Sequence, residues 1–216
     1  MTETQLKLIE AAEVEFAERG FDGSSVRAIT GRAKANIAAI NYHFGSKEAL
    51  FLEMVRHRIS PVNELRLDLL KNEQAKLGSR PVPVERIIDI LIRPLIVGFG
   101  TGEYGSAHFV RAMARGLAEH QHFMVEMQRE VLAELFRSFK HALSSCFPEQ
   151  PQDFAECAFH FLSCSLSGLM MQTHHAPSSS DQVSRQSLEL YADNFIAYVT
   201  GGLCNLARVY QPAPLA

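Results

Sequence analysis

Several side chains suited to contacting nucleic acid lie close together near the N-terminus. The segment Asn41-Tyr42-His43 carries an amide, a phenol hydroxyl and an imidazole, and Lys47 adds an ammonium group shortly after it. An asparagine amide can bond the edge of an adenine, whereas the other three groups can meet phosphate oxygens without reading sequence. These residue types predict a contact surface for DNA.

The local charge agrees with that interpretation, although the charge of the whole chain does not. The net charge of the chain is −3 at pH 7, which by itself does not favour nucleic-acid binding. From Ser24 to Lys47, however, every charged residue is basic, namely Arg27, Arg32, Lys34 and Lys47. A basic window of this kind can confine positive potential to one face of the protein.

The elements that must position these side chains are helices. Apolar residues recur at spacings of three and four without sustained alternation, which predicts an all-α protein. We expect a first helix to stop at Gly20 and a second to be capped by Ser24 or Ser25. A third should run from an Asn36 cap to Phe44. Two short helices joined by a tight turn predict a helix-turn-helix, whose second member lies in the DNA major groove.

The expected third helix has two distinct faces. Ile40 and Phe44 are four residues apart and should pack inward. Ile37, Ala38 and Asn41 share the opposite side, which would face the DNA. The small alanines at positions 38 and 39 allow close approach of the backbone or contact with a thymine methyl group.

The flanks of the helix-turn-helix carry candidate phosphate contacts. Ser25 and Arg27 lie near the start of the second helix and are placed to meet the DNA backbone. Tyr42, His43 and Lys47 are expected to do the same at the exit of the third helix. The alternative is that Tyr42 and His43 are half-buried core residues and Lys47 is a solvated neighbour of a helix cap.

Four segments of this region together resemble the N-terminal domain of TetR-family transcriptional regulators, over residues 1–50. They are Ala11-Ala12 through Phe16, Arg19-Gly20-Phe21, Ser24 to Ile29, and Ile40 to Leu50. The resemblance implies three helices that form a DNA-reading head, a fourth that links it to a larger helical domain, and two subunits that pair on a palindromic operator. It also implies that Lys47 and Arg27 contact the DNA backbone and that the recognition helix is lined by Asn36, Ile37, Ala39, Asn41, Tyr42 and His43.

Lys34 departs from the pattern of that family. Members usually have glycine at this place in the turn, where a positive φ is favoured, and a positive φ costs a residue with a Cβ about 1 kcal/mol or more. We therefore expect either a locally different turn or a strained Lys34. The hypothesis that its charge compensates by reaching a phosphate makes Lys34 part of the predicted DNA surface.

Residues 51–216 are expected to form a helical ligand-binding and dimerisation domain behind a DNA-binding domain at 1–50. Phenylalanine and methionine side chains supply adaptable apolar volume there, suited to a hydrophobic small molecule, although each one alone is more simply part of a core. The predicted ligand-binding residues are Arg93, Phe109, Arg111, Met113, Met127, Phe136, His160, Phe161, Met170 and Met171.

Helix boundaries in this region follow from the same periodicity. Pro61 is expected to kink or interrupt the fourth helix, because proline removes a backbone donor and clashes one turn back. A polar stretch at 71–83 reads as a connector. The remaining predicted helices span 84–99, 106–118, 121–145, 153–174 and 182–208.

Three polar residues of the ligand-binding set interrupt apolar patterns. Arg93, Arg111 and His160 would each need a partner if buried. A carboxylate or phosphate of the ligand could supply it, and a structural glutamate is equally compatible. The Phe109-Val110-Arg111 context and the Ile-Asn-Tyr-His-Phe motif are similar to family members that sense fatty acids or acyl-CoA esters. That resemblance implies a fatty acid or an acyl-CoA as effector.

The last two predicted helices, at 153–174 and 182–208, are long and have small or apolar faces. Two such helices from each subunit can form a four-helix interface, and a two-fold homodimer of this kind matches a palindromic operator. Core packing within one subunit is the alternative. The residues concerned are Ala155, Ala158, Ser165, Gly168, Leu190, Phe195, Val199 and Leu203.

The remaining signals predict neither an enzyme nor a cofactor nor a metal site. Gly100 to Gly105 matches GxGxxG but lacks the preceding strand of a nucleotide-binding unit. The histidine pairs at 120/122 and 174/175 lack the spacing of a helical metal site.

No strongly apolar span and no signal-peptide pattern is visible, so we expect a protein without membrane association in the cytoplasm. Taken together, the sequence predicts a ligand-responsive DNA-binding regulator, a repressor that releases a palindromic operator when a hydrophobic molecule binds. The alternative is an all-helical small-molecule-binding module or enzyme with an incidental N-terminal domain.

Overall fold

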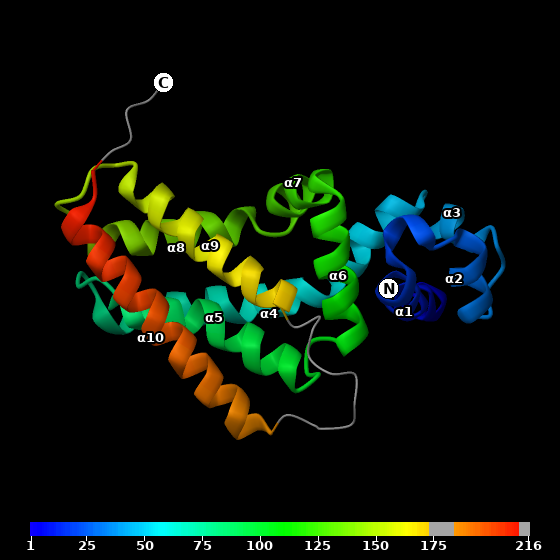
Figure 1. Cartoon of the computed structure of the whole chain (residues 1–216), viewed down its shortest axis with the longest axis horizontal. Helices are drawn as coiled ribbons and strands as arrows, with labels where there is room; N and C mark the ends of the chain where they lie inside the picture. Colours follow the sequence, from blue (N-terminus) through cyan, green and yellow to red (C-terminus); the bar gives the residue numbers. More distant parts are fainter. Residues whose placement is uncertain (173–183, 212–216) are drawn as a thin grey trace. The chain divides into compact units, whose positions relative to one another are not determined.

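The chain is built from helices. The computed structural model describes residues 1–172 and 184–211 (Figure 1), apart from the side chains of Leu117, Ala118, Gln121, Met124, Ser167, Met170, Met171 and Gln172. Within this part the elements are α1 (Glu3–Gly23), α2 (Val26–Arg32), α3 (Ala39–His43), α4 (Lys47–Leu77), α5 (Val84–Gly100), α6 (Ala107–Glu119), α7 (Gln121–Glu130), α8 (Ala133–Cys146), α9 (Phe154–Gln172) and α10 (Arg185–Val209). The prediction of an all-α fold is confirmed.

The helices form two compact units. Unit 1 contains Met1–Pro61 and Tyr104–Leu132, which carry α1 to α3, the first part of α4, α6 and α7. Unit 2 contains Val62–Glu103 and Ala133–Leu169, together with α10. The boundary falls inside α4, next to Pro61. The helix assignment of α4 nevertheless continues through this proline, so Pro61 does not interrupt the helix.

Unit 1 has an aromatic core in which α1, α4 and α7 meet. Phe51 stacks on Phe123 with ring centroids 4.5 Å apart, and Phe21 meets the two rings edge-on at 5.8 and 4.8 Å. Phe16 lies 5.5 Å from Phe21. A Cβ on Gly116 of α6 would lie 2.3 Å from the Phe51 ring, so the absence of a side chain lets α6 approach it. Such aromatic clusters bury large apolar areas.

Unit 2 has an aliphatic core in which α5 and α10 lie side by side (Figure 1). Nearly every turn of α5 is buried, including Ile87, Ile88 and Leu91. On α10 the buried face includes Val199 and Leu203. These two residues were expected at a subunit interface, but they pack within their own subunit. The alternative of internal core packing therefore holds for this face of α10.

The expected helix over 121–145 is in fact two helices. α7 ends at Glu130, where the N–H groups of Val131 and Leu132 both donate to the carbonyl of Met127, at 2.9 and 3.1 Å. The apolar spacing of three and four continues through this break, at Leu132 and Leu135. Periodicity alone therefore could not reveal the boundary.

Residues 71–77, expected to begin a connector, form the end of α4. Lysine, glutamate, glutamine and alanine in this stretch are good helix formers, and Glu73 pairs with Lys76 at 2.9 Å. The helix stops before Gly78, which has a φ of +62°. Glycine with positive φ is the usual residue just past a helix end.

Candidate nucleic-acid interface and effector region

The start of α2 is capped by one of the two serines that the sequence offered. Ser25 is exposed, and its hydroxyl accepts the N–H of Ala28 at 3.1 Å. Ser24 is buried, and its hydroxyl donates to the carbonyls of Glu15 and Gly20 at 2.9 and 2.7 Å. Ser25 is therefore the N-cap, and Ser24 fastens the end of α1 to the α2 entry. Arg27, in the first turn of α2, is exposed.

The turn after α2 places Lys34 in the left-handed region. Its φ is 52°. The N–H of Ala35 donates to the carbonyl of Thr30 at 2.9 Å, and the N–H of Lys34 donates to that of Gly31 at 3.2 Å. This pair of bonds is the Schellman arrangement, which needs positive φ at the residue that Lys34 occupies. Of the two expectations, the strained Lys34 is the one observed, and its side chain is exposed.

α3 is shorter than expected because the chain enters it through a side-chain turn. The Asn36 carboxamide oxygen accepts the N–H of Ala38 at 2.8 Å, and α3 proper begins at Ala39 with Ala38 as N-cap. Asn36 thus orders the approach to the helix instead of capping its first turn. The expected N-cap at Asn36 was therefore two residues too early.

The two faces of α3 follow the predicted spacing, except that Phe44, expected to pack inward, is half-buried at the C-cap. Ile40 is fully buried, whereas Ile37 is 57% exposed and Tyr42 85% exposed. Asn41 is exposed and His43 half-buried, with the Tyr42 and His43 rings 4.9 Å apart in an edge-on arrangement. Ala38 is exposed and Ala39 half-buried. An amide, a phenol and a small-residue surface therefore face outward together.

Lys47 has a more internal environment than its neighbours. It is half-buried, and its ammonium donates to the carbonyls of Phe21 and Ser24, at 2.9 and 3.0 Å. The same nitrogen lies 4.3 Å from the centroid of the Phe21 ring. Lys47 thus joins the start of α4 to the end of α1. Two of its three N–H groups point into unit 1.

Two buried glutamates that sequence reasoning did not single out support this surface. Glu15 accepts bonds from Nε and Nη2 of Arg32, at 3.0 and 2.9 Å, which holds α2 on α1. Glu13 accepts from Nε of Arg58 at 2.7 Å and from the hydroxyl of Ser106 at 3.0 Å. The signal was present in the sequence, since Glu13 and Glu15 lie among the inward-facing apolar positions of α1.

The residues predicted to bind a ligand are divided between the two units. In unit 1, Phe109, Met113 and Met127 are buried, and Arg111 is half-buried. Their burial agrees equally with a core role and with a pocket wall.

Apart from Arg93 on α5, the rest of the predicted ligand-binding set lies on α8 and α9. Phe136 is half-buried with its ring 4.8 Å from that of Phe159. His160 and Phe161 are exposed, Phe161 by 52%. The side chains of Met170 and Met171 lie outside the described part of the structure. The ligand-binding assignment of the set remains a prediction.

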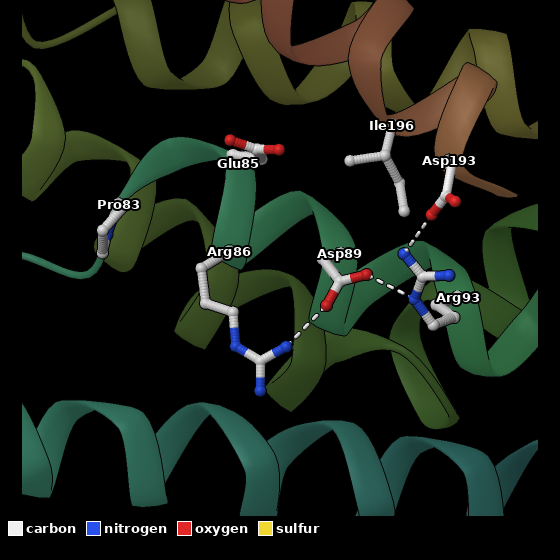
Figure 2. A pocket seen from close by; sticks show the side chains of 7 residues that line it. All are labelled: Pro83, Glu85, Arg86, Asp89, Arg93, Asp193 and Ile196. Atoms are coloured by element: carbon white, nitrogen blue, oxygen red, sulfur yellow. Dashed lines mark hydrogen bonds and ion pairs between the residues drawn. The ribbon is translucent and has the colours of Figure 1, made fainter.

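Arg93 lines a polar cavity of about 400 Å³ between α5 and α10 (Figure 2). Its guanidinium binds Asp89 at 2.6 Å, Glu189 at 2.7 Å and Asp193 at 2.8 Å. Partial burial, the largest single effect, acts to lower the pKa of Arg93, but the hydrogen bonds from the three carboxylates outweigh it and raise the pKa above its usual value. Its partners are therefore structural carboxylates, the second of the two possibilities left open by the sequence. The cavity lining is Pro83, Glu85, Arg86, Asp89, Arg93, Asp193 and Ile196.

Arg66 is a second functional candidate that sequence reasoning missed. It is 2% exposed. Nε and Nη2 donate to the carbonyl of Leu91, and Nη1 donates to the amide oxygen of Asn63 at 3.1 Å. Burial lowers the pKa of the Arg66 guanidinium to about 9, so the group is still protonated at neutral pH. The signal in the sequence is the spacing. Val62 and Leu70 lie four residues before and after Arg66, so Arg66 falls on an apolar face of its helix.

Residues 1–172 and 184–211 contain neither a candidate membrane span nor a candidate metal site. None of the helices there is both long and apolar enough to cross a membrane. Over the same residues, no group of three or more histidine, cysteine or acidic side chains is placed to hold a metal ion.

Comparison with known proteins agrees with this geometry along most of the chain. Residues 8–54 match the family described as bacterial regulatory proteins, tetR family, and residues 89–202 match the tetracyclin repressor-like C-terminal domain. The HTH-type transcriptional repressor NicS of Pseudomonas putida is 40% identical over 76 residues, which cover 33% of this chain and 36% of NicS. The matched segment thus spans about a third of that relative's length.

Solved structures share the fold at low sequence identity. The fatty acid degradation regulator FadR of Bacillus halodurans superposes with a TM-score of 0.63 at 16% identity, over 94% of this chain and 97% of FadR. FadR of Bacillus subtilis, solved in complex with stearoyl-CoA, gives a TM-score of 0.60 at 13% identity, over 91% and 98% of the two chains. At this identity the likeness shows the fold alone. Because the two family matches cover both the helix-turn-helix and most of the remaining helices, the chain belongs to the tetR family of bacterial regulatory proteins.

Proposed function

We propose that this protein is a transcriptional regulator that binds a palindromic operator as a homodimer and releases it when a small hydrophobic effector binds. The observation that carries the proposal is the outward face of α3. Asn41 and Tyr42 are exposed while Ile40, on the same short helix, is fully buried. A recognition helix needs this division, because its polar side must reach base edges while its apolar side holds it in place.

The proposed DNA contacts fall into two groups. Asn41, with the small alanines beside it, would read base edges, and Ile37 would supply apolar contact. The other residues would position the head on the backbone through phosphates. That second group comprises Ser25, Arg27, Lys34, Asn36, Tyr42, His43 and Lys47, all of which are exposed except the half-buried His43 and Lys47.

The proposed dimer interface uses the outward faces of α9 and α10. Large apolar side chains are exposed there: Leu190 by 62%, Tyr191 by 49% and Tyr198 by 70% on α10, and Phe161 by 52% on α9. Gly201 and Gly202 on α10 are also exposed. Exposed apolar side chains grouped on two long helices mark an association surface. A two-fold dimer would present two heads to the two half-sites of a palindrome.

Relatives support the effector class and the direction of regulation. FadR of Bacillus subtilis was solved with stearoyl-CoA, and NicS is named a repressor. By analogy, a fatty acid or an acyl-CoA is the proposed effector, and repression relieved by that effector is the proposed mode of action. The proposal involves no catalytic step, no cofactor and no membrane, and it places the protein in the cytoplasm with the DNA.

The decisive experiment measures DNA binding directly. Duplexes selected from a random pool should converge on a palindrome, and fluorescence anisotropy should show binding to it that weakens steeply with salt. Asn41→Ala should lose about 1–3 kcal/mol of specific binding and leave non-specific binding unchanged. Asn72→Ala, which alters an exposed asparagine near the end of α4, is the matched control and should bind as the wild type does.

The opposite result is equally clear. If no duplex is preferred over random DNA, or if Asn41→Ala binds the selected site like the wild type, α3 is not a recognition helix. The proposal would then fall, and a helical binding module with an incidental N-terminal domain would be the better interpretation.

A further inference from the structure

Arg66 is a buried cation among aliphatic side chains. It lies on α4 between Val62 and Leu70, one helical turn away on either side, and both are buried, with exposures of 0% and 2%. On the facing helix α5, Leu91 and Ile88 are also buried. The position thus continues an apolar stripe in which a leucine or methionine would be the ordinary residue.

The hydrogen bonds of Arg66 do not neutralise its charge. Its acceptors are a backbone carbonyl and a carboxamide oxygen, and both are uncharged. No carboxylate forms an ion pair with Arg66 in the part of the chain that the structure describes. A guanidinium has five N–H groups, three of which are used in these contacts, so two remain for a further acceptor.

Other arginines with little exposure show what is missing at this position. Arg58, on the same helix, binds the Glu13 carboxylate, and Arg93 binds three carboxylates. Arg66 is more deeply buried than either and has none. Removing a guanidinium from water is costly, and uncharged acceptors compensate the lost hydrogen bonds without compensating the charge. An anion placed beside Arg66 would compensate this charge.

We propose that Arg66 anchors an anionic group of the effector, a carboxylate or a phosphate ester carried on an apolar body. The inference rests on the proposed function, in which the helices behind the head hold an effector. The two remaining N–H groups lie one on Nη1 and one on Nη2, the pair of nitrogens with which arginine can bind two oxygens of a carboxylate or phosphate. The aliphatic side chains around Arg66 would contact the apolar body of such an effector. Arg93, whose charge is already compensated, is not the anchor.

The test compares probes that share a chain and differ in the head. Decanoate, decyl phosphate and decanol are titrated into the full-length protein, and binding is followed by calorimetry and by the shift in Tm. We expect at least one of the two anions to bind tenfold or more tightly than decanol, since charge-assisted hydrogen bonds supply that difference. The ratio between decanoate and decyl phosphate then identifies which head the site prefers.

Variants test whether Arg66 causes the preference for the anions over decanol. Arg66→Met keeps the length and apolar stem and should bring the anion and decanol to within about threefold of each other. Arg80→Met, which changes an exposed arginine of the same unit, is the matched control and should keep the tenfold preference. Arg66→Lys keeps the charge without the fork and should retain part of the preference, which provides a second measurement if Arg66→Met folds poorly.

Three results would overturn the inference: equal binding of decanol and both anions to the wild type, binding of none of the three probes, or an unchanged preference in Arg66→Met. Operator binding is measured on the same preparations without probe. If the wild type binds its operator but not the anions, the proposal for Arg66 is wrong and the proposed regulator function stands. If the wild type prefers the anions but binds no DNA, the proposed regulator function is wrong and the proposal for Arg66 stands.

Discussion

Glu13 and Glu15 lie two residues apart on α1, and each carboxylate binds an arginine from a different helix. Glu15 holds Arg32 of α2 at 2.9 Å, and Glu13 holds Arg58 of α4 at 2.7 Å. Glu13 also accepts from the N-cap hydroxyl of α6, Ser106, at 3.0 Å. One side of α1 therefore fastens the DNA-reading helices, while another fastens the helices behind them.

Neutralising these two glutamates should have separable effects. Glu13→Gln should lower the free energy of unfolding by about 2 kcal/mol, because the half-buried Arg58 loses its counter-charge. Glu15→Gln should destabilise the protein less, because Arg32 can turn to water, but it should weaken operator binding by loosening α2. Urea unfolding and anisotropy on the same samples measure both. If the two variants gave the same ratio of stability loss to binding loss, the division of labour along α1 would be wrong.

Gly20 should be hard to replace. Its φ is +74°, and a Cβ would lie 2.7 Å from Nη2 of Arg115. Gly20→Ala should therefore cost about 1–3 kcal/mol in unfolding free energy, through backbone strain and displacement of Arg115. Gly31→Ala is the control: Gly31 is helical, and a Cβ there meets nothing within 4 Å. That change should stabilise α2 by about 0.5–1 kcal/mol. Equal Tm values for the two variants would contradict the strain argument.

Lys34 combines a strained backbone with an exposed charge, and the two can be measured apart. Lys34→Gly should relieve about 1 kcal/mol of strain and raise Tm. If Lys34 reaches a phosphate, the same variant should bind the operator more weakly, and the slope of log K against log salt should shrink by about 0.9. A slope and affinity identical to those of the wild type would remove Lys34 from the DNA surface.

Lys47 and Arg27 offer a comparison between an inward and an outward cation. Both are predicted phosphate contacts, but Lys47 donates two hydrogen bonds to carbonyls of the α1–α2 segment, whereas Arg27 is exposed. Arg27→Met should reduce the salt slope by about 0.9. Lys47→Met should lower stability by about 1–3 kcal/mol, because two buried carbonyls lose a charged donor, and should change the salt slope by less than half as much. Equal changes in slope would show that Lys47 contacts the DNA backbone as directly as Arg27.

The proposed dimer interface can be broken without touching the core of unit 2. Tyr198→Glu adds a charge at a side chain that is 70% exposed, so the isolated subunit should fold normally. In the dimer the charge would be buried without a partner. We therefore expect the dissociation constant of the dimer, measured by sedimentation velocity, to rise at least tenfold. His141→Glu, on the exposed side of α8, should leave the dimer intact. An unchanged dimer in Tyr198→Glu would place the interface elsewhere.

The sequence alone determined the class of fold and the character of α3. Period and capping residues are local properties, and they predicted an all-α chain, the inward Ile40 and the outward Asn41 correctly. Lys34 was singled out by the resemblance to the tetR family, whose members usually have glycine at this place in the turn, and its positive φ is observed. Boundaries were less certain where the spacing of apolar residues continued across a break, as at Val131, or where a side-chain turn replaced the first turn, as at Asn36.

Only the tertiary structure decided which charges are compensated. Arg93 and Arg66 look alike in the sequence, since each interrupts an apolar run. In the fold, Arg93 meets Glu189 and Asp193 from a helix almost a hundred positions away, whereas Arg66 meets a carbonyl and an amide. Periodicity places a side chain on a face of its own helix. The partner across that face is set by how distant helices pack. The electrostatic role of a buried group depends on that partner, so the sequence alone could not decide it.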